Sequence, residues 1–290
     1  MVKKKAKKAS TLLRGDVMYH YLQKELRVRD IWMFQALTAR MIADLGVWFH
    51  PVVYERLPVL LPHVVRDAAA RGRKGGVDQW GAPDNYGHVR DDNSLIKLIP
   101  KSLTISAPTH AHYDGKRIGT GWVASHVWRL CTDGSHAAKN SLTNSFVPNL
   151  VWLPDAVSKL TDREGAFVQR YTQALAHKIY GNRKVHAKLR EFTCAAWDEL
   201  ELPKEIPEQG LPDTNTLNYF MPDEAWFQRR LSPLEKAREA LDLCAEGHPV
   251  PGKVSPGRWV PGLKKLASDS TEDLRSLMQG YMAAVAAAKP

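Results

Sequence analysis

The sequence has few cysteines and no long apolar run, and these shortages exclude several classes of protein. Cysteine occurs at positions 131, 194 and 244 only, and none of the three belongs to a CxxC pair. We therefore expect neither a disulfide framework nor a zinc site built on thiolates. The longest apolar runs, such as 59–61 and 282–288, fall far short of the roughly 20 residues that a membrane-spanning helix needs, so no membrane span is expected.

Two further signals are missing. The lysines near the start of the chain are not followed by an apolar segment, so this region does not resemble a secretory signal, and a cytoplasmic protein is expected. The basic, glycine-rich stretch 71–76 lacks the GxxxxGK[ST] pattern and therefore is not a P-loop. No internal repeat is present, which argues against a repeat architecture.

The charge of the chain is strongly positive. Its formal net charge is +10 and its isoelectric point is near 9.5, and residues 1–10 form a lysine-rich arm that we expect to be disordered. A basic surface attracts polyanions, of which nucleic acid is the commonest inside cells. The alternative is a solubilising tail on a generally basic surface.

Apolar spacing predicts a mostly helical chain with a few strands. A periodic pattern indicates a long helix over 29–49, followed by a bent or broken helix over 52–70 that is divided by prolines. An S/T-x-x-E capping box at Thr161 precedes a helix that ends near Gly181, and a second helix covers 185–197. A similar box at Ser232 predicts a helix ending at Gly247, and a final helix starts near Thr271.

Strands are predicted in the middle of the chain. Residues 103–106 and 117–128 resemble strands, 150–153 is a second apolar strand, and 202–222 reads as a loop without periodicity. The predicted fold class is α+β, mostly helical, with a central ββα unit flanked by helical lobes. The predicted regions are the arm at 1–10, an N-terminal helical region at 11–101, the core at 102–182 and a C-terminal helical region at 183–290.

The clearest candidate for a catalytic site lies between residues 121 and 162. A short apolar strand ends at His126, a spacer rich in Ser and Asn follows, and a second strand is introduced by Pro148-Asn149. Pro154 then precedes an acidic residue, which is typical of the first turn of a helix. Two strands and a helix are therefore expected to surround His126 and Asn149.

The segments Ala124-Ser-His-Val-Trp128 and Pro148-Asn-Leu-Val-Trp-Leu153 resemble the HNH, or ββα-metal, endonuclease motif in its restriction-type form. The resemblance covers roughly 40 of the 290 residues. It implies that His126 is the general base that deprotonates a water and that Asn149 holds the geometry of the site. It also implies a divalent metal, Mg²⁺ first and Mn²⁺ as the alternative. Because the chain lacks a four-cysteine knuckle, no structural zinc is expected.

The chain departs from the family pattern where metal ligands are expected. Ser125 stands directly before the base, and Ser158 stands on the helix where the family usually has His or Asn. Serine is a poor metal ligand, so Asp155, one turn earlier on the same helix face, or Asp162 could take the role. The remaining candidates come from loops and are Asn140, Asn144, Asp91 and Asp92.

The chemistry of such a site is physically coherent. A neutral imidazole can accept a proton from water near pH 7, and a divalent ion would stabilise charge on the phosphate. Arg129 lies close to the base and could neutralise a phosphate through two hydrogen bonds. The structural alternative is a strand histidine whose ring is satisfied by a backbone carbonyl, with Asn149 as a turn residue.

Several other residues are candidates for binding. His110 and His112 are spaced to share one face of a strand, where they could bind a metal only if other ligands were supplied. Trp80 and Tyr86 lie in a polar loop where stacking on a base is conceivable, whereas Trp122, Trp128 and Trp152 fit a core role better. The cations expected to contact nucleic acid are Arg71, Arg73, Lys74, Arg90, Lys116 and Arg117.

The sequence therefore predicts a metal-dependent endonuclease that cleaves double-stranded DNA, with a sequence-specific restriction or defence role by analogy with the family. A homodimer is the favoured state, because a palindromic target needs two sites. The first alternative is a non-catalytic nucleic-acid-binding protein with a degenerate HNH motif. The second is a basic helical structural protein without a site.

Overall fold

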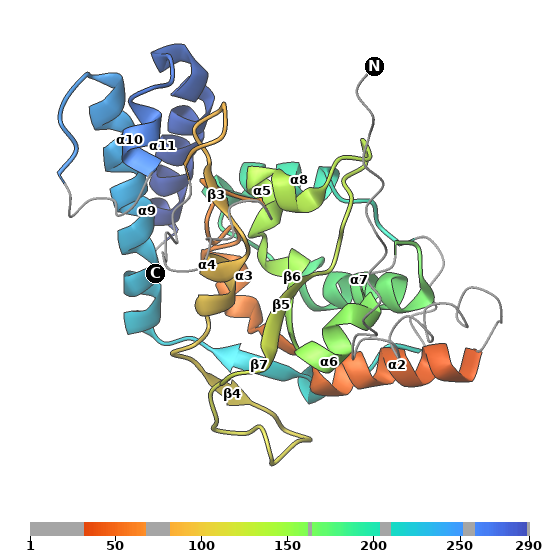
Figure 1. Ribbon diagram of the computed structural model, residues 1–290. Helices are drawn as coiled ribbons and strands as arrows, with labels where there is room; N and C mark the ends of the chain where they lie inside the picture. The colour runs from red at the N-terminus through yellow and green to blue at the C-terminus, as the bar shows by residue number, and fades with distance from the viewer. Residues whose placement is uncertain (1–31, 68–81, 162–163, 204–209, 252–258, 289–290) are drawn as a thin grey trace, which may run out of the picture.

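A five-stranded mixed sheet lies at the centre of the protein. The structure is a computed structural model that describes residues 32–67, 82–161, 164–203, 210–251 and 259–288 (Figure 1). The strand order is β4-β7-β1-β6-β5. The strands are β1 (Val47–Phe49), β4 (Thr104–Ser106), β5 (Trp122–His126), β6 (Leu150–Pro154) and β7 (Asn218–Met221).

The pairing makes β5 an edge strand of this sheet. Strand β1 runs parallel to β7 and antiparallel to β6, and β5 is antiparallel to β6 with His126 opposite Leu150. A separate two-stranded sheet pairs β2 (Val64–Arg66) with β3 (Val89–Asp91) in parallel. The fold is therefore a mixed α/β arrangement with a small mixed sheet.

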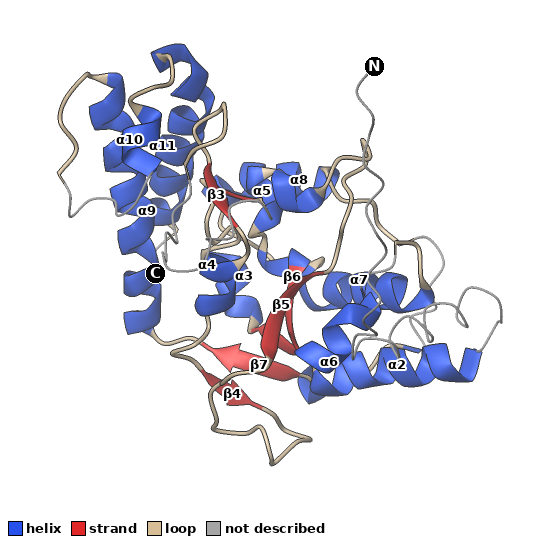
Figure 2. Ribbon diagram, in the orientation of Figure 1, coloured by secondary structure: helices blue, strands red, loops and turns tan. Residues whose placement is uncertain are grey.

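Helices gather on both sides of the sheet (Figure 2). Helices α9, α10 and α11 form one group, and α2 packs against α7 in another beside α6 (Figure 1). The helices are α2 (Trp32–Leu45), α3 (Pro51–Arg56), α4 (Ser94–Leu98), α5 (Ser141–Asn144), α6 (Asp155–Ser158), α7 (Phe167–Tyr180), α8 (Arg190–Asp198), α9 (Glu224–Ala245), α10 (Trp259–Leu263) and α11 (Glu272–Ala287). Within the described ranges, none of them is both long and apolar enough to cross a membrane.

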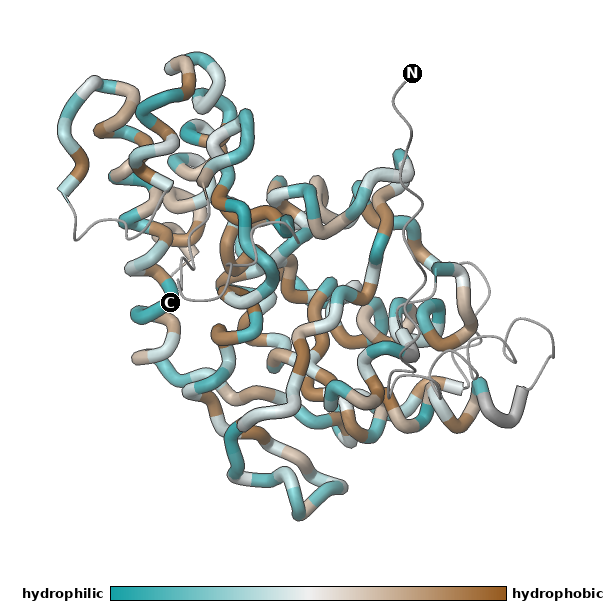
Figure 3. The backbone as a smooth tube through the Cα atoms, viewed as in Figure 1, coloured by the Kyte–Doolittle hydropathy of each residue, from teal (hydrophilic) through white to brown (hydrophobic). Residues whose placement is uncertain are grey.

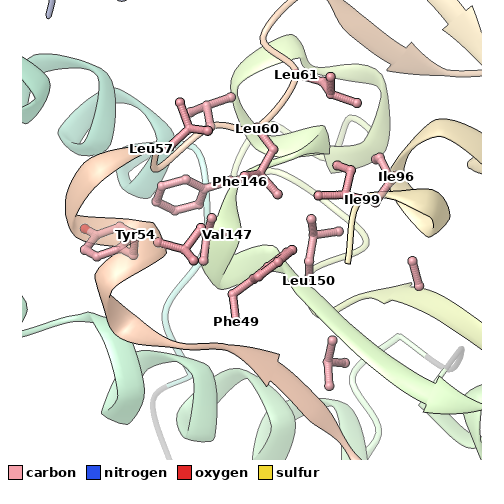
Figure 4. Packing of buried hydrophobic residues seen from close by; sticks show 14 of the residues in the cluster. Phe49, Tyr54, Leu57, Leu60, Leu61, Ile96, Ile99, Phe146, Val147 and Leu150 are labelled. Atoms are coloured by element: carbon pink, nitrogen blue, oxygen red, sulfur yellow. The ribbon is translucent and has the colours of Figure 1, made fainter. Parts of the chain in front are cut away.

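Aromatic side chains from the sheet form much of the core. The ring of Trp152 lies 5.1 Å from that of Phe49 and 5.5 Å from that of Phe220, each edge-to-face. Figure 4 shows Phe49 in the same cluster as Phe146 and Leu150. Edge-to-face pairs of this kind stabilise the core beyond the burial of their area. By contrast, the excursion between β4 and β5 is largely hydrophilic in Figure 3.

The predicted long helix is shorter than the pattern indicated. In the described part of the chain, α2 ends at Leu45, and residues 47–49 are a fully buried strand rather than the end of a helix. Gly46 makes the change of direction possible, because a Cβ there would lie 2.5 Å from the Ile42 carbonyl oxygen and 3.2 Å from the Val151 side chain. The β-branched and aromatic residues that follow suit a central strand.

Other boundaries also differ. Pro51 begins α3 instead of ending a helix, and 64–66 is a strand where a broken helix was predicted. The predicted loop 202–222 contains β7, which lies in the middle of the sheet. These errors share a cause, since three- and four-residue strands are too short to show a period of two.

Both predicted capping boxes are wrong. Helix α7 is preceded by Ala166, and the Thr161 hydroxyl instead donates to the Ser158 carbonyl at 2.7 Å. Helix α9 starts at Glu224, where the Asp223 carboxylate accepts from the Trp226 backbone N–H at 2.6 Å, and Pro233 lies inside the helix. The predictions of a strand at 103–106, a helix ending near Gly247 and a final helix from Thr271 are confirmed to within a residue or two.

Candidate active site

Strands β5 and β6 and helix α6 frame the candidate site. The two strands pair antiparallel over their whole length, and the Asp155 backbone N–H at the start of α6 donates to the Gly121 carbonyl at 2.9 Å. Helix α6 is only four residues long and continues as the 3-10 helix η4 (Lys159–Thr161). The predicted order of strand, excursion, strand and short helix is thus present in the chain.

His126 stands at the end of β5, and its ring is held in one orientation. Nε2 lies 2.9 Å from the backbone carbonyl oxygen of Asn144 and 3.2 Å from Oδ1 of the same residue. Both partners are acceptors, so we assign the ring proton to Nε2. Nδ1 then carries the free lone pair, and it has no hydrogen-bonding partner among the described residues.

Asn144 connects this histidine to a distant strand. Its Nδ2 donates to the Val64 carbonyl of β2 at 2.8 Å, while its two oxygens face His126. The short helix α5 that carries Asn144 is capped by Asn140, whose Oδ1 accepts from the backbone N–H groups of Leu142 and Thr143. Both asparagines therefore have hydrogen-bonding roles that explain their positions without a metal.

Asn149 is fully buried and joins two segments of the backbone. Its Oδ1 accepts from the Trp128 backbone N–H at 2.7 Å, and its Nδ2 donates to the Thr143 carbonyl at 2.8 Å. Its own carbonyl accepts from the Val127 N–H at 3.0 Å. Asn149 thereby fixes the chain directly after His126 against the segment that supplies Asn144.

The electrostatic surroundings keep His126 neutral. Burial, and to a smaller degree the positive charge of Arg66, lower the pKa of His126, the hydrogen bonds to Asn144 oppose both effects, and the resulting pKa is about 4. The pKa of this ring is thus well below its ordinary value, and the imidazole is uncharged at pH 7. A neutral imidazole is the form that can accept a proton.

Three cations open onto the pocket that contains His126. The pocket has a volume of about 360 Å³, and Arg66, Arg129 and Lys139 line it together with the second imidazole of His136. None of the three cations makes an ion pair or side-chain hydrogen bond with another described residue. No carboxylate is among the described residues that line it. This concentration of unpaired positive charge favours an anionic ligand.

Asn93 reaches the same pocket from the loop before α4. It is the one described residue other than glycine with a positive φ, 84°, a conformation that asparagine tolerates better than most residues. Its Nδ2 donates to the Ala124 carbonyl on β5 at 2.8 Å. Asn93 therefore ties the preceding loop to the free edge of the strand that carries His126.

The described donors do not fit a divalent ion held by protein ligands. Ser125 and Ser158 line the pocket, but the Ser158 hydroxyl donates to the Asp155 carbonyl at 3.0 Å. The Asp155 side chain is exposed and does not line the pocket, and Asp162 lies outside the described residues. No group of three or more His, Cys, Asp or Glu that could hold a metal occurs in the described ranges.

The acidic loop candidates cap a helix. The Asp91 carboxylate accepts from the hydroxyl of Ser94 at 2.8 Å and from the backbone N–H of Leu95 at 3.1 Å, and Asp92 accepts from the Ser94 N–H at 3.2 Å. Burial raises the pKa of Asp91. These contacts fit the start of α4 and leave no sign of a metal role.

Two further predictions are corrected by the structure. His110 and His112 lie in or beside a turn and not on one face of a strand, and Nδ1 of His112 lies 3.5 Å from Lys116 Nζ. The Arg90 guanidinium donates to the Ala82 carbonyl at 2.8 Å and pairs with Asp67 at 3.3 Å. Two of the Arg90 guanidinium donors are therefore used within the fold, although its side chain is 39% exposed.

The other predicted binding residues do not line this pocket. Lys116 and Arg117 are exposed on the segment between β4 and β5. Trp128 and Trp152 are core residues as expected, and Trp122 is partly buried against the ring of Tyr113 at 5.6 Å. Tyr86 is exposed beside His88. The arm at 1–10 and the residues Arg71, Arg73, Lys74 and Trp80 lie outside the described residues.

Sequence reasoning missed most of the cations that line the pocket. Arg66 could not be placed because its strand was taken for a helix, and Lys139 carried no motif. Asn144 was considered only as a metal ligand, whereas it is the hydrogen-bonding partner of the base. The one available signal was the Ser/Asn-rich spacer, since short polar side chains in a loop often bond to nearby backbone.

Removing the charge at position 66 should raise the pKa of His126. In Arg66→Gln we expect a value above about 4 but still below 6.5, because burial is the larger cause and remains. The imidazole signals of His126, followed by NMR from pH 3 to 8, measure the change. Arg238→Gln, an exposed cation on α9, is the matched control and should leave the titration unaltered. An unchanged pKa in Arg66→Gln would contradict the proposed influence of this charge.

No family model, no curated protein and no solved structure matches the chain.

Proposed function

We propose that the chain is an HNH-type endonuclease that hydrolyses phosphodiester bonds of double-stranded DNA, with His126 as general base. The observation that carries the proposal is the meeting of a neutral, oriented imidazole with three cations that pair with no described residue, all in one pocket. A phosphodiester needs both features, since its charge must be neutralised and its attacking water must lose a proton. The motif around His126 and Asn149 supports the same reading.

In the proposed reaction a water oxygen forms a bond to phosphorus while its proton passes to Nδ1 of His126. The bond from phosphorus to the leaving sugar oxygen breaks, and solvent protonates that oxygen. Nδ1 is covered by protein atoms in this conformation, so a neighbouring side chain must move to admit the water. The exposed Arg66 and Lys139 side chains can move, because no described partner holds them.

The cations and asparagines have supporting roles in this proposal. Arg129 is suited to a bidentate contact with the phosphate, and Arg66 and Lys139 add charge around it. Asn144 and Asn149 are positioning residues that hold the ring and the backbone beside it. The family resemblance implies Mg²⁺ or Mn²⁺, but no step is assigned to an ion because the described donors do not supply a site for it.

The biological setting that suits this chemistry is a cytoplasmic restriction or defence nuclease, acting as a homodimer on a palindromic target. A second candidate is a non-catalytic DNA-binding protein that uses the same pocket. The serines at positions 125 and 158 favour it, because they stand where the family has metal ligands.

Incubation of the purified protein with supercoiled plasmid tests the proposal. Reactions contain Mg²⁺, Mn²⁺ or EDTA, and DNA affinity is measured in parallel at several salt concentrations. We expect nicked or linear plasmid in at least one condition. We also expect a salt slope that falls by about one in Arg129→Gln relative to Arg238→Gln, since one phosphate contact is lost. Intact plasmid in every condition with a persistent salt-dependent shift would support the binding protein instead. Affinity without any salt dependence would contradict both candidates.

A further inference from the structure

A second pocket adjoins the basic pocket across one stretch of chain. It has a volume of about 440 Å³ and is bordered by the segment 128–134 and by the face of α7 that carries Gln169 and Gln173. Trp128 lines both pockets, so the two share this residue in their walls. A single ligand that occupied both pockets would have to extend across Trp128.

The second pocket has a different chemical character. Glu164 and Glu201 line it together with Arg170, whereas the described lining of the basic pocket has cations and no carboxylate. A phosphate would meet two carboxylates here and is not the expected ligand. An uncharged group with hydrogen-bond donors and acceptors fits this lining better.

Gln173 is the residue that indicates an uncharged ligand with hydrogen-bond donors and acceptors. Its side chain is 8% exposed, and no described residue forms a hydrogen bond with its amide. Gln169, one turn earlier, is held at both ends, since Oε1 accepts from the Gly165 N–H at 2.7 Å and Nε2 donates to Glu164 at 3.1 Å. Gln173 therefore offers one acceptor and two donors to the pocket, and an apolar ligand that displaced water from them would leave them unpaired at a cost.

The shared wall is fixed before any ligand binds. The Trp128 indole N–H donates to the Glu201 carbonyl at 2.8 Å, and its ring lies edge-to-face with that of Trp197 at 5.6 Å. Trp128 is 1% exposed, so the partition between the pockets does not depend on a mobile side chain. A preformed pocket loses less conformational freedom when a ligand binds.

We propose that the second pocket receives an unpaired nucleobase from the nucleotide whose phosphate lies in the basic pocket, with Gln173 recognising the edge of the base. The inference rests on the proposed function, because it requires nucleic acid in the basic pocket. A nucleotide has one part that suits each pocket. Its anionic phosphate suits the basic pocket, and its neutral base, which has donors and acceptors, suits the second pocket. A carboxamide can pair with a base edge through two hydrogen bonds. In duplex DNA the base must leave its stack, as in enzymes that extrude a nucleotide.

Mononucleotides test this inference without requiring cleavage. The four 2′-deoxynucleoside 5′-monophosphates and 2-deoxyribose 5-phosphate, which has no base, are titrated into the full chain by calorimetry. In the wild type we expect at least one nucleotide to bind about tenfold more tightly than the sugar phosphate, the effect of one good bidentate contact. In Gln173→Leu this difference should disappear, while the affinity for the sugar phosphate stays unchanged. Gln228→Leu on α9, an exposed glutamine, is the matched control and should behave as wild type.

Each other outcome has a distinct meaning. If nucleotides and sugar phosphate bind equally to the wild type, the second pocket is not a base site. The basic pocket is then still supported as a phosphate site. If Gln173→Leu weakens the sugar phosphate as well, the effect is structural and the inference fails. Gln173→Glu retains the shape but lacks the donors, so its preference among the four bases should change even if the leucine variant is unstable. If no ligand binds, the inference fails. The plasmid assay then tests the proposed nuclease activity separately.

Discussion

Replacing His126 by alanine is expected to slow phosphodiester cleavage by about 10²–10⁴-fold, the range for the loss of a positioned general base. DNA affinity should change little, because His126 is uncharged at neutral pH and the three cations of the pocket remain. Initial rates of plasmid cleavage and equilibrium binding at one salt concentration separate the two effects. His136→Ala is the matched control, since His136 lines the same pocket but is exposed and does not contact Asn144.

The pH dependence adds an independent check on His126. A base must be unprotonated to act, and the folded pKa of about 4 leaves the ring neutral above that value. We therefore expect kcat/KM to be maintained from pH 8 to about 5 and to be lost as the pH falls through about 4. An acid limb near the ordinary value of 6.5, or equal cleavage by wild type and His126→Ala, would contradict the role given to this residue.

Asn149→Ala is expected to lower the free energy of unfolding by about 2–4 kcal/mol. The substitution removes both hydrogen bonds of a fully buried amide and leaves the Trp128 N–H without this partner in the interior, whereas the Thr143 carbonyl keeps its backbone donors, among them the Phe146 N–H. Each unsatisfied buried group costs about 1–3 kcal/mol. Urea denaturation at pH 7, followed by tryptophan fluorescence, measures the change.

The matched control for Asn149 is another asparagine in a solvent-exposed position. Asn215→Ala should change stability by no more than about 0.5 kcal/mol, as for most surface substitutions. Asn149→Asp retains an acceptor for Trp128 but loses the donor to Thr143 and buries a charge, so it should also be destabilising. A stability of Asn149→Ala equal to that of wild type would show that the two hydrogen bonds do not hold this segment.

The strands that frame His126 could be predicted because their signals are local. Residues 150–153 form a short apolar run bounded by polar residues and prolines, and 122–126 precedes a spacer rich in Ser and Asn. The final helix was predictable for a similar reason, since Leu274, Met278, Tyr281 and Val285 repeat at helical spacing and are all buried. In each case the relevant pattern lies within a few residues of the element that it forms.

The remaining strands could not be predicted in this way. Strand β1 is three residues long and gains its stability from pairing with β6 and β7, which lie far away in the sequence. Strand β2 becomes a strand only by pairing with β3. A three-residue segment carries too little periodicity to distinguish a strand from a helix, so its partners determine its conformation.

The sequence by itself determined the two strands, the short helix that follows them and the placement of His126 and Asn149 beside that frame. Their types and spacing are local properties of the chain. Only the tertiary structure decided which groups surround the histidine. Arg66 from β2, Lys139 from the spacer and the carbonyl of Asn144 meet there because β2 packs against the spacer helix α5, where Asn144 donates to the Val64 carbonyl and faces His126. Electrostatics depends on distance in space and not on distance along the chain, so the neutral base and the unpaired cations that support the proposed function became visible only in the folded protein.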